Sequence, residues 1–317
     1  MKKLESKLLD IIVPIFNKEI FLSELTKSLA LLCQEKVNVI FVDDGSTDQS
    51  LKVLESNLSV NFFVYFKENG GVSSARNYGL RKSKSKYIWF FDPDDKLGSD
   101  VFNIIDSLNE YNEDILIFNY NIKLDKTGEL RSFKFDSYGL ISSEYFVEKY
   151  SYFTNKNNMS FIWNKLYKSS FIKGFYFDES VHLSEDRRFN INIFNENPVV
   201  LILNSFLYEY YIYDGGTLST AINLKKIEDV YKTNLLNLKT LGFPIKSSII
   251  HIRTQLISRA LLGEKKLLSF YLQESFRLNL SIVNIKGFKN IFILFLIYIG
   301  IFKMVYNFYM FFRSRFN

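Results

Sequence analysis

The sequence is poor in the side chains that most often build metal clusters and nucleophilic sites. Its 317 residues include one cysteine, Cys33, and two histidines, His182 and His251. A single cysteine excludes a disulfide within the chain and fits a reducing compartment. These three residues indicate neither a zinc cluster nor a nucleophilic site, and Cys33 is expected on the apolar side of the first helix, in the core.

A glycine-rich turn is also missing where a dinucleotide-binding enzyme has one. The first apolar stretch, Leu8–Ile15, is followed by Phe and Asn rather than glycines, which argues against a nicotinamide-dependent oxidoreductase. No secretory leader is expected, because the same stretch has no small-residue cleavage site after it. No motif typical of nucleic-acid-binding proteins is present, so nucleic acid is not an expected partner.

No apolar stretch reaches the length of a clear membrane span. Ile291–Phe302 is uncharged, but Lys303 interrupts its continuation to Phe312; a span needs about 20 apolar residues, and a central lysine costs about 2.5–3.5 kcal/mol. From 241 to 317, eleven basic residues stand against two acidic ones, although the whole chain carries only +6. We expect a helix lying on an anionic membrane surface, with a buried helix or an oligomer contact as the alternative.

The most informative stretch that is present is Phe90-Phe91-Asp92-Pro93-Asp94-Asp95. It follows the apolar run that begins at Tyr87, and crowded acids after a buried strand are costly without a positive partner. Mg²⁺ and Mn²⁺ favour carboxylate oxygens and leave other coordination positions to water and phosphate. We expect Asp94 and Asp92 to hold Mn²⁺ or Mg²⁺, with Asp95 as a less certain third ligand. A solvated acidic turn is the alternative.

Three more apolar runs precede this one, and the chain alternates between strand and helix patterns. The predicted strands are Leu8–Ile15, Val37–Val42, Phe62–Phe66 and Tyr87–Phe91. Asn17 is a predicted N-cap, and Ser46 with Gln49 a predicted capping box. The alternation indicates a parallel sheet that binds ligands beyond the carboxyl ends of its strands. The polar residues expected at that edge are Asn17, Asp43, Asp44, Asn69, Gly70, Gly71, Asp92 and Asp94.

These segments together resemble the inverting family 2 glycosyltransferases of the GT-A fold, of the type that builds bacterial capsules and O-antigens. The motifs are Val13–Asn17, Val42–Asp48, Asn69–Asn77 and Phe91–Asp95, with Trp163–Tyr167 and Ser184–Asp186 further on. The resemblance implies an α/β fold with a Rossmann-like, mostly parallel central sheet flanked by helices, and a helical C-terminal region. We expect a catalytic domain over 1–220, with a nucleotide-sugar half over 1–112 and an acceptor half over 113–220. Residues 221–317 form the expected membrane-associated region.

The resemblance also implies roles for single residues. It places Pro14, Phe16 and Asn17 at the nucleoside, and Asp43 or Asp44 at a uracil imide, whose N–H suits a carboxylate acceptor. Asn69, Gly70, Arg76 and Asp92 complete the expected nucleotide-sugar site. Asp186 is the expected catalytic base, Glu185 its neighbour in catalysis, and Trp163 a platform for the acceptor. The alternatives are a turn with a helix cap at Asp44, a capped helix start at Glu185-Asp186, and a core position for Trp163.

The expected activity is metal-dependent, inverting transfer of a sugar from a UDP-sugar to a lipid-linked or growing surface glycan. The enzyme would lie at the inner face of the bacterial membrane, in the cytoplasm, and a homo-oligomer is possible. A non-catalytic nucleotide-sugar-binding protein is the alternative; it would keep the donor pocket without transferring sugar.

Overall fold

The computed structural model describes residues 6–32, 36–142, 145, 160–213 and 233. All of them belong to the first of two compact units, Met1–Phe243; the second, Pro244–Asn317, lies outside the described residues. The predicted membrane-associated region, 221–317, is therefore outside them apart from Thr233 and stays a prediction. Within the described ranges, no helix has both the length and the hydropathy that crossing a membrane requires.

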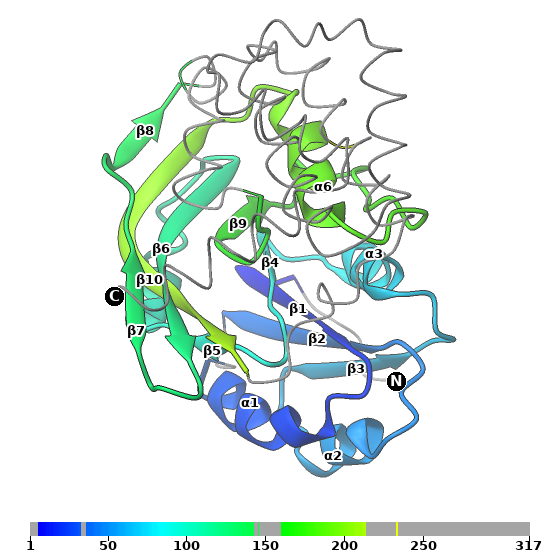
Figure 1. The fold of residues 1–317 in the computed structure, drawn as a ribbon. Coiled ribbons are helices and arrows are strands. Elements are labelled where there is room, and N and C mark those ends of the chain that lie inside the picture. Colours follow the sequence, from blue (N-terminus) through cyan, green and yellow to red (C-terminus); the bar gives the residue numbers. More distant parts are fainter. Residues whose placement is uncertain (1–5, 33–35, 143–144, 146–159, 214–232, 234–317) are drawn as a thin grey trace, which may run out of the picture. The chain divides into compact units, whose positions relative to one another are not determined.

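Strands and helices alternate through the first hundred residues, and strands then predominate (Figure 1). The strands are β1 (Leu9–Ile15), β2 (Val37–Asp43), β3 (Phe62–Phe66), β4 (Tyr87–Phe90), β5 (Lys96–Leu97), β6 (Ile115–Leu124), β7 (Leu130–Phe133), β8 (Gly139–Ile141), β9 (Lys165–Lys168) and β10 (Val200–Ile212). The helices are α1 (Glu19–Leu32), α2 (Ser50–Ser56), α3 (Val72–Lys82), α4 (Val101–Ser107) and α6 (Glu185–Phe194).

The described strands form one sheet in the order β3-β2-β1-β4-β9-β6-β10-β5, with β7 beside β6 and β8 beside β10. The first four strands are parallel, as predicted for this half of the sheet. Beyond β4 the sheet is mixed, because β9 runs antiparallel to both its neighbours, β4 and β6. The description "mostly parallel" therefore holds for that half, and the fold class is mixed α/β.

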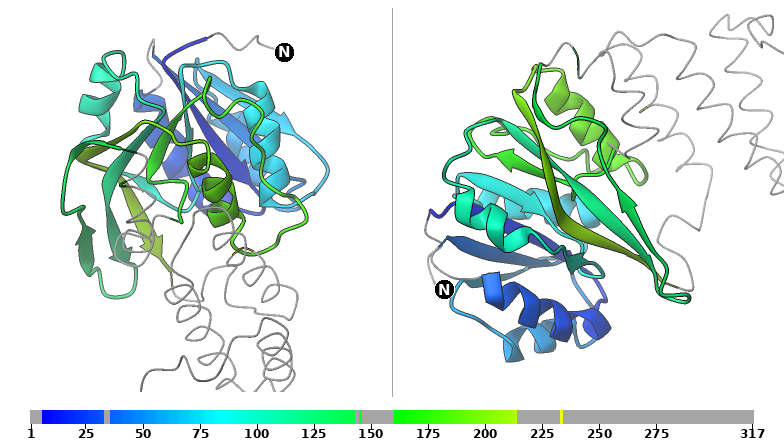
Figure 2. Two further views of the ribbon diagram at one scale, coloured as in Figure 1. Left: turned by 90° about the horizontal axis from the view of Figure 1, so that it is seen from above. Right: turned by 90° about the vertical axis from the view of Figure 1, so that its left-hand side faces the viewer.

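The central strand β1 is buried on both faces, as a strand covered by helices must be. Its odd-numbered side chains, such as Ile11, join a core with α1, α2 and α4, whereas Ile12 joins a second core with α3 and α6. Figure 2 shows α1 and α2 side by side on one flank of the sheet. α3 approaches β1 closely at Gly79, where a Cβ atom would lie 2.4 Å from the Ile12 side chain.

The N-termini of α1 and α2 cap each other, which corrects both predicted caps. The Asp48 carboxylate accepts the Ser50 N–H at 2.9 Å and the Glu19 N–H at 3.1 Å, so one side chain serves both helices. Asn17 does not cap α1, because its Oδ1 accepts a backbone N–H from the loop after β2. Ser46 does not begin a capping box, because α2 starts at Ser50 and the Ser46 Oγ accepts the Asn17 N–H.

At the opposite end of the sheet, the buried carboxylate of Asp10 ties β1 to the segment before β4. It accepts hydrogen bonds from the Ser83 and Ser85 hydroxyls at 2.7 and 2.5 Å, and from the Lys84 and Ser85 backbone at 2.7 and 3.0 Å. The Asn38 amide on β2 donates to it at 2.8 Å. This network fixes the amino ends of three parallel strands and leaves their carboxyl ends for the site.

We expect Asp10→Ala to destabilise the protein by about 3 kcal/mol or more. The substitution leaves several buried hydrogen-bond donors without an acceptor, and each such donor costs about 1–3 kcal/mol. The measurement is the urea unfolding midpoint of the full chain. Asp106→Ala is the matched control: Asp106 pairs with Lys36 at the surface and its side chain is 79% exposed, so its loss should cost less than about 1 kcal/mol. Equal shifts in the two variants would contradict the structural role given to Asp10.

Candidate active site

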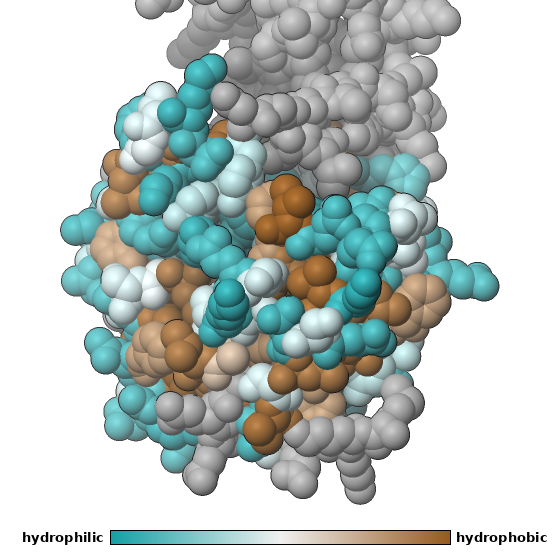
Figure 3. Space-filling model, turned by 90° about the horizontal axis from the view of Figure 1, so that it is seen from below, coloured by the Kyte–Doolittle hydropathy of each residue, from teal (hydrophilic) through white to brown (hydrophobic). Residues whose placement is uncertain are grey.

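The carboxyl ends of the parallel strands meet at one edge, as predicted. Ile15 pairs with Asp43, and Asp43 with Phe66, so β1, β2 and β3 end level with one another. Among the predicted residues, Phe16, Asn17, Asn69 and Gly70 are exposed there, whereas Pro14, Asp43 and Asp44 are buried. On the face seen in Figure 3, apolar side chains form small patches among hydrophilic ones.

The aspartate pair after β2 holds the loops of this edge together. Asp44 accepts the backbone N–H groups of Gly70 and Gly71 at 3.1 and 2.7 Å and the Lys67 ammonium at 2.6 Å. Gly71 has φ +87, a conformation that favours glycine, and this turn starts α3. Asp43 accepts the Ser46 N–H at 2.8 Å with one oxygen, while no hydrogen-bond partner among the described residues reaches the other.

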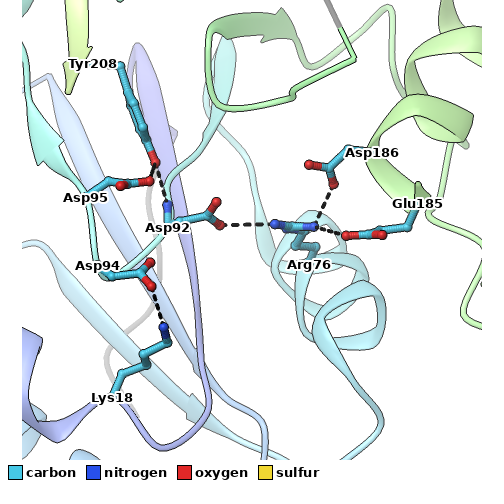
Figure 4. A network of polar contacts seen from close by, with 8 residues as sticks. All are labelled: Lys18, Arg76, Asp92, Asp94, Asp95, Glu185, Asp186 and Tyr208. Atoms are coloured by element: carbon cyan, nitrogen blue, oxygen red, sulfur yellow. Dashed lines mark hydrogen bonds and ion pairs between the residues drawn. The ribbon is translucent and has the colours of Figure 1, made fainter. Parts of the chain in front are cut away.

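Arg76 on α3 joins three carboxylates from distant parts of the chain (Figure 4). Its guanidinium lies 3.0 Å from Asp92 Oδ1, 2.8 Å from Asp186 Oδ1 and 3.5 Å from Glu185 Oε1. The Arg76 side chain is buried, and its guanidinium also lies over the ring of Phe177. The predicted donor-side and catalytic acids therefore share one cation.

Burial sets the proton affinity of these groups. It raises the pKa of Asp186 to about 8, against the opposing effect of Arg76 and with the help of Glu185 and Asp92. Burial also raises the pKa of Asp92, although Arg76 opposes this too. The side chains of Asp92 and Asp186 remain 26% and 19% exposed, so both are accessible from outside.

Helix α6 begins with the predicted acids, and the residue before them is conformationally strained. Ser184 has φ 70, which is uncommon for a residue with a side chain, and its hydroxyl makes no cap hydrogen bond. Glu185 and Asp186 occupy the first turn. Such strain persists where the surrounding structure fixes it, often at functional sites.

The acidic turn after β4 uses its three carboxylates differently (Figure 4). Asp92 faces Arg76, and Asp94 Oδ2 lies 2.5 Å from the Lys18 ammonium. Asp95 is buried, and its oxygens accept the Tyr208 hydroxyl at 2.6 Å and the Tyr211 N–H at 2.8 Å. Burial, reinforced by the charge of Asp92, raises the pKa of Asp95 well above its ordinary value.

This geometry decides which acids fit a divalent cation. Among the described residues, no group of three or more metal-binding side chains is present. Mg²⁺ needs only one or two carboxylates when phosphate supplies further oxygens, and the partly exposed Asp92 and Asp94 fit that requirement. Asp95 does not fit, because its two oxygens accept hydrogen bonds from Tyr208 and Tyr211 in the core. The prediction of Asp95 as a third ligand is therefore corrected: Asp95 holds the turn in place.

Trp163 is a core residue and not an exposed platform, which corrects its predicted contact with the acceptor. It is 2% exposed and stacks on Tyr208 with ring centroids 4.5 Å apart. Phe161 stacks on it at 4.6 Å. Trp163 thus positions Tyr208, whose hydroxyl also accepts the Asp92 N–H at 3.2 Å.

Comparison with family models places residues 10–176, more than half of the chain, within the family described as "Glycosyl transferase family 2". The chain belongs to glycosyl transferase family 2. The match contains the four motifs between Val13 and Asp95 and ends ten residues before the base candidate, Asp186. Asp186 nevertheless contacts Arg76, which lies inside the matched range.

Relatives of this family member are bacterial proteins. It is 28% identical to glycosyltransferase GlyA of Streptococcus pneumoniae over 78% of this chain and 37% of GlyA. It is 29% identical to the minor teichoic acid biosynthesis protein GgaB of Bacillus subtilis over 65% of this chain and 23% of GgaB. The chain thus spans less than half the length of these two relatives.

Solved structures show the same fold. The Staphylococcus aureus TarS 1–349 structure in complex with UDP-GlcNAc has a TM-score of 0.59 and 22% identity, covering 74% of this chain and 67% of TarS 1–349. The complex of the same protein with UDP has a TM-score of 0.57. The GT-A-like fold expected from the resemblance is confirmed.

Several residues of this family 2 site had no predicted role. Lys165 lies fully buried on β9; its ammonium donates to Asn164 Oδ1 at 2.7 Å and to the carbonyl of Phe161. Burial lowers the pKa of Lys165 to about 7, and the charge of Asp186 opposes this. Asn190 on α6 donates to the same carbonyl at 3.2 Å, so one short segment supports both Lys165 and the helix of the base candidate. The Trp163–Tyr167 motif marked this segment without indicating its contacts.

We expect Tyr208→Phe to destabilise the protein by about 1–2 kcal/mol, because it removes a hydroxyl that bonds to both Asp92 and Asp95 but keeps the stacked ring. Urea unfolding, with amide hydrogen exchange at the acidic turn, measures this. Tyr210→Phe is the matched control, since Tyr210 stacks on the same Trp163 while the turn keeps its hydrogen bonds. If both variants lose the same stability, Tyr208 does not hold the turn through its hydroxyl.

Proposed function

We propose that this protein transfers a sugar from a UDP-sugar to a hydroxyl of a surface glycan or its lipid-linked precursor, with inversion at the anomeric carbon. The observation that carries the proposal is the shared contact of Asp92 and Asp186 with Arg76. Through this contact Asp92, at the predicted diphosphate site, and Asp186, a carboxylate with a raised pKa, bind the same guanidinium. Family membership and the fold support the same conclusion.

A nucleotide site at the carboxyl edge is supported by the groups gathered there. Phe16 is 46% exposed and offers an aromatic face to a base. Of the buried Asp43–Asp44 pair, Asp43 keeps one carboxylate oxygen without a hydrogen-bond partner among the described residues, and such an acceptor suits the imide N–H of uracil. The fold's likeness to TarS, a protein crystallised with UDP and with UDP-GlcNAc, favours the same nucleotide.

The diphosphate would lie against Arg76 and the acidic turn. A Mn²⁺ or Mg²⁺ ion held by Asp92 and Asp94 would supply Lewis-acid stabilisation of the charge on the departing phosphate. Arg76 keeps Asp92 oriented. Burial lowers the pKa of Arg76, but the negative charges of Asp186, Asp92 and Glu185 outweigh it and raise the pKa overall, so the guanidinium stays cationic throughout. Tyr208 fixes the turn that presents both aspartates.

Asp186 is the proposed base. As the acceptor oxygen bonds to the anomeric carbon, its proton passes to Asp186, and the bond to the UDP oxygen breaks with its electron pair on UDP. Arg76 holds the carboxylate in place, and Glu185 adjoins it in the first turn of α6. A base with a pKa near neutrality balances availability against proton affinity.

The relatives support the proposed acceptor class. GgaB is named for teichoic acid biosynthesis, and a glycan acceptor assembled at the membrane is consistent with the basic, apolar residues 241–317. We therefore propose attachment to the inner face of the membrane through that region.

We expect Asp186→Asn to lower turnover by about 10²- to 10⁴-fold, because the amide cannot take the proton, while UDP affinity changes by less than about threefold. In the wild-type enzyme, kcat/KM should rise with pH through about 8, since only ionised Asp186 accepts a proton. Glu196→Gln, an exposed change beyond α6, is the control. Unchanged turnover in Asp186→Asn would remove Asp186 from the mechanism.

Donor class is tested by UDP release from a panel of UDP-sugars, with matching GDP- and CDP-sugars. We expect one or a few UDP-sugars to release UDP faster when a glycan acceptor is present. Binding of UDP-sugar with neither transfer nor hydrolysis across the panel would favour a non-catalytic nucleotide-sugar-binding protein instead.

A further inference from the structure

Lys18 lies between β1 and α1, and its ammonium contacts Asp94 of the acidic turn, whereas Arg76 contacts Asp92 (Figure 4). Its Nζ is 2.5 Å from Asp94 Oδ2, with the two side chains 25% and 31% exposed. The Lys18 N–H donates to Ser50 Oγ at 2.9 Å, which anchors the residue to α2. Its Nζ lies 5.3 Å from the centroid of the Phe21 ring.

Every carboxylate of the acidic turn thus has a protein partner. Asp92 has Arg76, Asp95 has Tyr208, and Asp94 has Lys18. Two of these partners are built into the core, because Arg76 and Tyr208 are buried. Lys18 is the partly exposed one, and its long side chain can leave Asp94 without unpacking a core.

An ammonium on Asp94 and a divalent cation on Asp94 compete for the same oxygens. At a few ångströms, two positive charges repel each other strongly where water screens them incompletely. A cation that binds Asp94 must therefore displace Lys18. The displaced ammonium then needs an anionic partner, and the diphosphate beside the cation provides one, since lysine binds phosphate as a mobile point charge.

We propose that Lys18 is a donor-binding residue that neutralises Asp94 while no donor is bound and moves to the diphosphate when a divalent cation takes Asp94. This inference rests on the proposed function, because it requires a nucleoside diphosphate at the edge of the sheet. It makes binding of the cation and of UDP mutually dependent. Bound UDP stabilises the displaced Lys18 and so strengthens cation binding, and by linkage the cation strengthens UDP binding by the same factor.

The test measures Mn²⁺ binding to the full chain by electron paramagnetic resonance, with and without UDP. We expect UDP to strengthen Mn²⁺ binding in the wild type. In Lys18→Met, Mn²⁺ binding without UDP should tighten about two- to fivefold, the range for loss of a partly exposed ion pair. UDP binding in the presence of Mn²⁺ should weaken by a similar factor, so the coupling between the two ligands falls.

Two further variants control this experiment. Lys27→Met removes an exposed lysine from α1, the helix that follows Lys18, and should leave both affinities unchanged. Lys18→Arg keeps the positive charge and should retain weak Mn²⁺ binding without UDP. The unfolding midpoint of each variant shows whether it is folded. If Lys18→Met does not fold, Lys18→Arg provides the test. The inference would then be overturned if Lys18→Arg bound Mn²⁺ as tightly without UDP as with it.

The inference about Lys18 and the proposed function fail in different ways. If Lys18→Met binds Mn²⁺ without UDP no better than the wild type does, the inference is overturned, although UDP binding and sugar transfer can still stand. If Lys27→Met reproduces the effect, a general change in surface charge explains it and the inference is also overturned. If the wild-type protein binds no UDP at all, the proposed function fails first and the inference fails with it.

Discussion

The buried guanidinium of Arg76 is the interaction on which the site depends. A buried charge is costly unless it is paired and hydrogen-bonded, and Arg76 has three carboxylates around it. These acids come from the segment after β4 and from the first turn of α6, about ninety residues apart in sequence. Without the cation, three crowded carboxylates would repel one another, so Arg76 fixes both the geometry of the site and its charge.

The fold supports this interaction from several sides. The Gly71 turn starts α3, and the missing side chain at Gly79 lets that helix lie directly on β1, which sets the position of Arg76. On α6, Phe189 stacks on Phe177 with centroids 4.0 Å apart, and Phe177 lies beneath the Arg76 guanidinium. The acidic turn and the start of α6 are therefore connected through one small cluster of aromatic and charged side chains around Arg76.

Much of this arrangement could be predicted from the sequence, because its signals are local. Apolar runs followed by turn residues indicated β1 to β4, and parallel strands necessarily bring their carboxyl ends together. Asp92, Arg76 and Asp186 were recognisable through motifs. The direction of Asp95 was not, since adjacent residues of a turn point to opposite sides and only the contact with Tyr208 shows which side is the core.

Other features depend on contacts between distant segments and left no pattern in the sequence. A tryptophan at position 163 suits both a core position and a platform for a sugar, and only its burial in the structure decides between the two. Lys18 is one of many lysines in the chain until β1 and β4 bring it beside Asp94. The shared capping of α1 and α2 by Asp48 likewise needs both helix starts in place.

The most direct test of this account is the pKa of the Asp186 carboxyl group, measured by carbon-13 NMR titration of the unliganded protein. The account predicts a pKa of about 8, and a still higher one in Arg76→Gln, where the neighbouring positive charge is removed. A pKa near the ordinary aspartate range, unchanged by that substitution, would show that Asp186 is neither buried with these acids nor held by Arg76, and would contradict the site described.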